Sequence, residues 1–138
     1  MDSLDQTVER YHVGLGDFVK GDPRPVLQLF SQREDVVLCN PLHPFARGPK
    51  EVAETTEQAA SHFAGGVHEV EMVTAFATAE LAYTVHIERF RATIDGREGS
   101  GALRVSTIFR LEDHGWRIAH RHADPIPKPQ AMASVLQE

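Results

Sequence analysis

The spacing of apolar residues changes part-way along the chain, and this change limits the folds available to it. Before residue 66, apolar residues recur every three or four positions, as on one face of an α-helix. After residue 66 they alternate with polar residues in long runs, as in β-strands. Helices that come first and strands that come second favour a helix layer on an antiparallel sheet over repeated strand–helix–strand units. We therefore predict an α+β fold, and 138 residues suffice for one core.

The first part of the chain predicts three helices and one short strand. One apolar stripe predicts a helix over residues 4–18, and Gly21-Asp22-Pro23 ends it and begins a second helix. Residues 34–39 are β-branched and apolar, which predicts a strand, followed by a loop through residue 48. Pro49 opens the third helix, and Gly65-Gly66 is expected to end it.

The second part of the chain predicts consecutive strands joined by tight turns. Asp95-Gly96 and Asp113-His114-Gly115 stand where hairpin turns are needed, so neighbouring strands should pair antiparallel. The predicted strands are residues 67–78, 81–94, 102–112 and 115–123.

Prolines mark the end of the predicted domain. Pro125, Pro127 and Pro129 lack the backbone N–H groups that a sheet needs. We expect a single domain over residues 1–124 and a Pro-rich C-terminal tail over residues 125–138.

Charge and cysteine content exclude several classes of function. The net charge of −6 provides no basic surface for a phosphate backbone, so we expect no nucleic-acid partner. The single cysteine, Cys39, excludes an intramolecular disulfide and a multi-cysteine zinc site, and it suits a reducing compartment. Residues 1–5 lack the basic and apolar regions of a signal peptide, and no apolar run is long enough to cross a membrane. We expect a cytoplasmic protein with no membrane partner.

Strand alternation predicts which side chains of the last hairpin face the interior. If the turn sets Leu111 opposite Trp116, regular alternation places Thr107, His120 and His122 on the inner face of the sheet. The two histidines then lie beyond an apolar end formed around Trp116. Two imidazoles two residues apart on a strand point the same way, which is one pattern found in metal sites. We find no third inward ligand, however, and expect no metal.

The preceding strand is interpreted in the same way. Its apolar residues Tyr83, Val85 and Ile87 are expected to face inward, which carries Arg89 inward too. A buried arginine beside histidines is costly unless it is paired or solvated, so the pattern predicts a wet pocket or a bound anion. The same rule predicts the outward residues Thr84, His86, Glu88, Arg104, Arg110, Arg117 and Arg121.

Residues 104–122, with the run Trp116-Arg-Ile-Ala-His-Arg-His, resemble the closing hairpin of the SnoaL-like branch of the nuclear transport factor 2-like superfamily. Residues 35–48, followed by a helix, look like that family's first strand and loop. The branch is related to ketosteroid isomerase and polyketide cyclases. The chain is also similar to the association domain of calmodulin-dependent protein kinase II, which has an arginine at the position of Arg89 and a second one where this chain has Thr107. The resemblance implies a cone-shaped, strongly curved antiparallel sheet covered by three N-terminal helices, and a homodimer through the outer sheet face.

Two classes of function remain open at this point. In the first, the domain is an isomerase, cyclase or dehydratase without a cofactor, in which His120 is the general base. Arg89 then stabilises an oxyanion or binds a carboxylate, while Thr107, His122 and Asn40 orient a small organic ligand that has a carboxylate or carbonyl oxygen. Tyr83 and Trp116 are expected to contact the apolar part of that ligand. In the second class, the domain is a ligand-binding or homo-oligomerisation module without chemistry.

Overall fold

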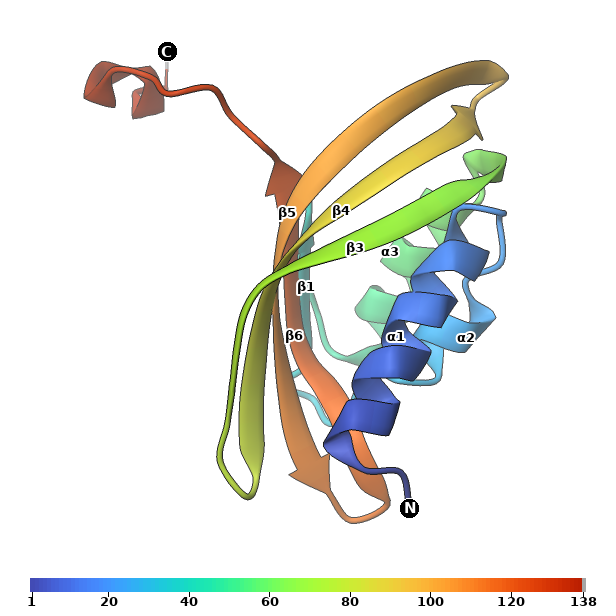
Figure 1. The fold of residues 1–138 in the computed structure, drawn as a ribbon, viewed down its shortest axis with the longest axis vertical. Coiled ribbons are helices and arrows are strands. Elements are labelled where there is room, and N and C mark those ends of the chain that lie inside the picture. The colour runs from blue at the N-terminus through green and yellow to red at the C-terminus, as the bar shows by residue number, and fades with distance from the viewer. Residues whose placement is uncertain (138) are drawn as a thin grey trace.

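The computed structural model describes residues 1–137 and folds them into a helix layer on one curved sheet (Figure 1). The helices are α1 (Leu4–Phe18), α2 (Arg24–Leu27), α3 (Pro49–Ala60) and the short 3₁₀ helix η1 (Met132–Val135). The strands are β1 (Val37–Asn40), β2 (His43–Arg47), β3 (Phe63–Ala77), β4 (Leu81–Ile94), β5 (Arg97–Glu112) and β6 (Gly115–Pro125).

The sheet confirms the predicted α+β class and the antiparallel hairpins. Its strand order is β2-β1-β6-β5-β4-β3, and only the contact between β1 and β6 is parallel. The helices α1, α2 and α3 lie on one side of the strongly bent sheet (Figure 1). We call that side of the sheet the inner face and the opposite side the outer face. At the turn between β4 and β5, Asp95 and Gly96 both have positive φ, as a two-residue hairpin requires.

Several predicted boundaries differ from the structure, including those of the first strand, which is β1 (Val37–Asn40), and of the last, which ends at Pro125. Residues 43–47, expected in a loop, form the edge strand β2, and β5 begins at residue 97 rather than 102. β3 begins at Phe63, so Gly65-Gly66 lies inside a strand and does not end α3. A Cβ atom at Gly66 would lie 2.4 Å from the carbonyl oxygen of Arg91. This glycine therefore permits a close approach of two strand backbones.

A capped first turn and a stripe of buried residues account for helix α1. Ser3 and Gln6 form a reciprocal capping box that satisfies free N–H groups at the helix start. Tyr11 and Leu15 lie on the face that packs against the sheet, and both are buried. Because this face reaches the middle of the sheet, α1 brings the hydroxyl of Tyr11 into the protein interior.

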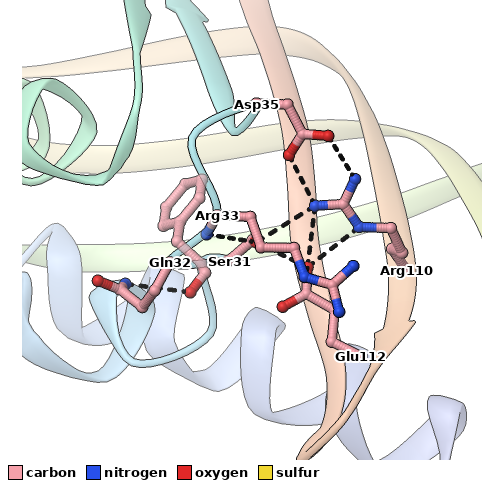
Figure 2. A network of polar contacts seen from close by, with 7 residues as sticks. Ser31, Gln32, Arg33, Asp35, Arg110 and Glu112 are labelled. Atoms are coloured by element: carbon pink, nitrogen blue, oxygen red, sulfur yellow. Dashed lines mark hydrogen bonds and ion pairs between the residues drawn. The ribbon is translucent and has the colours of Figure 1, made fainter.

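A network of charged groups fastens the loop before β1 to the end of β5 (Figure 2). Arg110 donates two hydrogen bonds of 2.8 Å to the carboxylate of Asp35 and one of 3.0 Å to Glu112. The buried Ser31 donates to the same Glu112 carboxylate at 2.6 Å. These hydrogen bonds from Arg110 lower the pKa of Asp35. The network lies at the end of β5 and holds this loop in place.

Beyond β6 the chain leaves the sheet and projects away from the helices (Figure 1). Residues 126–131 form no regular element, and the η1 side chains are exposed. Residue 138, the end of the predicted tail, lies outside the described residues. Within residues 1–137, no helix has the length and apolar character needed to span a membrane.

Candidate functional site

A cavity of about 360 Å³ lies between the helices and the inner face of the sheet. Its wall is mostly apolar and includes Phe18, Phe30, Phe63 and Phe90. This combination of an apolar wall and a few polar groups is typical of small-molecule sites. The polar residues of the wall are Asn40, Thr56, His62, His68, Glu88, Asp95 and Arg121.

An ion pair forms the most buried polar part of this wall. Arg121 donates two hydrogen bonds to the carboxylate of Glu88, at 2.6 and 3.0 Å. Only 3% of the Glu88 side chain and 12% of the Arg121 side chain are exposed. Arg121 also donates to the hydroxyl of Tyr11 at 2.6 Å, and that hydroxyl shares a 3.0 Å hydrogen bond with Thr107. Helix α1 and strands β4, β5 and β6 thus meet at one buried polar cluster.

Two histidines complete the surroundings of Glu88. The Nε2 atoms of His68 and His86 lie 3.2 and 2.7 Å from its two carboxylate oxygens. Burial by itself would raise the pKa of Glu88, but the charge of Arg121 and the hydrogen bonds from His68, His86 and Arg121 hold it well below its usual value. Glu88 is therefore a fully ionised, fully bonded carboxylate at neutral pH, which makes it a poor proton acceptor.

One hydroxyl in the wall lacks a partner. Thr56 on α3 is 5% exposed, and its Oγ1 atom makes no hydrogen bond with any residue among 1–137. A buried hydroxyl without a partner costs free energy, so such a group in a cavity wall suggests a ligand or a bound water.

The mouth of the cavity carries a second set of polar groups. The side-chain oxygen of Asn40 accepts hydrogen bonds from the backbone N–H groups of Leu42 and His43, at 2.9 and 3.0 Å. Elsewhere in the wall, Nδ1 of His62 lies 2.7 Å from a carboxylate oxygen of Asp95. Both His62 and Asp95 are partly exposed, and both line the cavity.

The inward placement predicted for His120 and His122 is wrong because β6 contains a bulge. The pairings of Leu111 with Trp116 and of Phe109 with Ile118 are as predicted. The next pair is Ile108 with His120, so Ala119 has no partner on β5. A single extra residue reverses the alternation of everything that follows it.

Past the bulge, Arg121 and Ala123 line the cavity, and His120 and His122 lie on the outer face. Arg121 therefore faces inward, contrary to its predicted outward placement. Burial and the neighbouring His122 lower the pKa of His120, and their ring centroids are 6.4 Å apart. Within residues 1–137 no three His, Cys, Asp or Glu side chains are placed to hold a metal ion.

The predicted faces of β4 are also reversed. Arg89 lies on the outer face, where it forms a 2.9 Å ion pair with Glu71 and is half exposed. Tyr83, also predicted inward, stacks on Phe76 of the outer face. The buried inner residues of this strand are Ala82, Thr84, His86, Glu88 and Ala92. Glu88 can be buried there because His68, His86 and Arg121 contact its carboxylate, and Arg121 is bonded in turn to Tyr11.

The other predicted site residues have mixed positions. Asn40 lines the cavity as expected. Thr107 faces inward, but it is fully buried against Tyr11 and is not part of the cavity wall. Trp116 packs against the hydrophobic core at the far end of the sheet. The sequence interpretation did not include four residues of this polar cluster: Tyr11, His68, Glu88 and Arg121. The sequence does contain a clue to them, because Glu88 and Arg121 are charged residues on strands that must be buried on one face.

A family model described as a SnoaL-like domain matches residues 10–127. The chain belongs to the SnoaL-like domain family. The match covers α2, α3, the whole sheet and most of α1, so every element around the cavity is part of this SnoaL-like domain. No curated protein matches the chain in sequence.

Solved structures share the fold of this SnoaL-like domain at low sequence identity. A candidate calcium/calmodulin-dependent protein kinase type II association domain from Thiobacillus denitrificans is 16% identical, with a TM-score of 0.77 over 92% of this chain and 98% of that one. A ketosteroid isomerase-like protein from Erwinia carotovora atroseptica is 21% identical, with a TM-score of 0.75 over 91% and 95%. A nuclear transport factor 2-like superfamily protein from Salmonella enterica is 19% identical, with a TM-score of 0.73 over 92% and 91%. These likenesses confirm the predicted nuclear transport factor 2-like fold.

Proposed function

We propose that this SnoaL-like domain binds a small, largely apolar molecule with a neutral oxygen acceptor, such as a ketone, in the inner cavity. The observation that carries the proposal is the unpartnered hydroxyl of Thr56 in an apolar, buried wall. A ligand oxygen that accepts from this hydroxyl satisfies it, and the aromatic wall residues bury the rest of the ligand.

The charge around the cavity favours a ketone over a carboxylate. Arg121 faces the cavity, but its positive charge is already compensated by Glu88. A ligand carboxylate would bring a second negative charge close to Glu88 in a poorly solvated site. A neutral oxygen can accept from Thr56 without that repulsion.

A pair of matched ligands tests the proposal. We expect 1-tetralone to bind roughly 2- to 10-fold more tightly than tetralin, which lacks the oxygen, because one neutral hydrogen bond contributes about 0.5–1.5 kcal/mol. In Thr56→Val this preference should disappear, and in the control Thr55→Val, on the neighbouring position of α3, it should remain. Isothermal titration calorimetry measures both affinities. A preference that survives in Thr56→Val, or a failure of both compounds to bind, would contradict the proposal.

We also propose that two copies of the chain associate through the outer face of the sheet. Phe76, Tyr83 and Ile108 stand directly opposite one another on β3, β4 and β5, and all three are exposed. A continuous apolar row on an exposed sheet face is typical of an interface. A second copy presents the same row, so a two-fold arrangement covers both at once.

Sedimentation velocity tests this association. Tyr83→Glu places a charge in the middle of the row and should shift a dimer to monomer at micromolar concentration. The control Val13→Glu changes an exposed residue of α1, away from the row, and should leave the dimer intact. A wild-type chain that sediments only as a monomer would refute the dimer.

A further inference from the structure

We propose that His120 and His122 form one half of a zinc site, which the same two histidines of a second copy of the chain complete. The inference rests on the association proposed above for the outer face of the sheet, and it adds a metal ion to that interface. The sequence predicted these imidazoles on the inner face without a third ligand. The bulge in β6 places them on the outer face, where a second copy can supply the missing ligands.

The two histidines point the same way from β6. They are two residues apart on a strand and both follow the bulge, so they share the outer face. Their ring centroids are 6.4 Å apart. Two imidazole nitrogens on one tetrahedral zinc ion lie about 3.3 Å apart, because each Zn–N bond is about 2.0–2.1 Å long. A rotation of the His122 ring brings both rings to one ion, and 53% of the His122 side chain is exposed, which leaves room for that rotation.

The surroundings of His122 leave its imidazole available. Nε2 of His122 lies 3.9 Å from a carboxylate oxygen of Asp124, which is beyond hydrogen-bond distance. Asp124 already accepts two hydrogen bonds from Arg104, at 2.7 and 3.1 Å. Because no set of three ligands is placed to hold a metal ion within the described chain, residues 1–137, one copy offers only the pair of histidines.

The position of His120 on the sheet brings two such pairs together. His120 stands opposite Ile108, which belongs to the exposed apolar row of Phe76, Tyr83 and Ile108. The row therefore continues onto β6. A two-fold axis along the row sets each of its members, and His120 with them, against the same residue of the second copy. Two histidines from each copy then lie around one point on the axis and provide the four ligands of a tetrahedral zinc ion.

Burial of these imidazoles in an interface favours a metal ion between them. A polar group that loses its water without gaining a partner costs free energy. Imidazole nitrogens are preferred ligands of Zn²⁺, so one ion replaces the lost water for both copies at once. The apolar row supplies contact area beside the ion, and the four nitrogens fix how the two sheets face each other.

Zinc binding and association are measured on the same chain. We expect isothermal titration calorimetry with ZnCl₂ to give one ion per two wild-type chains. In sedimentation velocity, Zn²⁺ at 100 times its Kd for the dimer should lower the Kd of the dimer about 100-fold, because an ion that binds only the dimer stabilises it by mass action. EDTA should reverse this shift.

Two substitutions and one control assign the ligands. His120→Gln and His122→Gln each remove one imidazole per chain, and both variants should lose the response to Zn²⁺. The control His114→Gln alters an exposed histidine in the hairpin between β5 and β6 and should respond as the wild type does. A response to Zn²⁺ that persists in either of the first two variants, or one ion bound per chain, would overturn the shared site.

The metal-free measurement separates this inference from the association on which it rests. If the chain is a dimer without metal and Zn²⁺ neither binds to it nor tightens it, the zinc site is wrong and the association stands. If the chain stays monomeric both with and without Zn²⁺, both proposals are wrong.

Discussion

Replacing Arg121 by Met is expected to lower the free energy of unfolding by about 3–5 kcal/mol, which is the usual cost of breaking a buried ion pair from one side. The substitution leaves the carboxylate of Glu88 in the protein interior without its cation, while Met fills most of the vacated volume. Urea denaturation followed by circular dichroism measures the change through the shift in midpoint.

Arg104→Met is the matched control. Arg104 also forms a bidentate ion pair, with Asp124, but on the outer face where both side chains are much more exposed. Exposed pairs contribute about 0–1 kcal/mol, so this variant should unfold nearly as the wild type does. Equal losses in the two variants would show that the Glu88–Arg121 pair is not the buried anchor of the inner face.

The pH dependence of unfolding checks the same pair. The pKa of Glu88 is held well below its usual value in the folded chain, so the stabilisation is present above a pH of about 4.3, the ordinary pKa of a glutamate. It is lost as the pH falls towards the lowered value in the folded state. Without Arg121 the burial of Glu88 raises its pKa above the unfolded value, so the sign of this dependence reverses: in Arg121→Met the contribution of Glu88 to stability should increase as the pH falls.

Deletion of Ala119 is expected to reduce stability by more than about 4 kcal/mol or to prevent cooperative folding. Without the extra residue, regular alternation turns Arg121 and Ala123 outward and His120 and His122 inward. Glu88 then loses its cation, and two imidazoles take the place of groups that fit the cavity wall. Circular dichroism and urea denaturation measure the loss.

Deletion of Ala131 is the control for chain shortening. Ala131 is an alanine like Ala119, but it lies in the exposed segment before η1. Its removal should change the free energy of unfolding by less than about 0.5 kcal/mol. If the chain without Ala119 unfolds like the wild type, the bulge is not required for the inner face of β6.

The sequence interpretation was correct where structure follows from local pattern. The stripe over residues 4–18 gives α1 with the predicted bounds, and Asp95-Gly96 forms the predicted hairpin turn. Both depend on neighbours within a few positions, whose spacing is visible in the sequence. The error at residues 43–47 has the opposite cause, because a short edge strand that contains a proline depends on its pairing with β1.

The predicted placement of the β4 side chains was wrong because both faces of this strand carry a plausible pattern. Tyr83, Val85 and Ile87 are apolar and occupy the outer face, while His86 and Glu88 are polar and occupy the inner one. The rule that apolar residues face inward does not account for a polar cluster built around the buried ion pair of Glu88 and Arg121. Those members come from α1, β3 and β6, far apart in the sequence.

The sequence by itself determined the order of elements, the hairpins and the SnoaL-like family, because periodicity, turn residues and the run of residues 104–122 are local properties. Only the tertiary structure decided which face of each strand lines the cavity. One unpaired residue in β6 and one buried ion pair between β4 and β6 reversed the predicted faces, and both depend on contacts between distant segments. For this reason the guanidinium in the cavity belongs to Arg121 and not to Arg89.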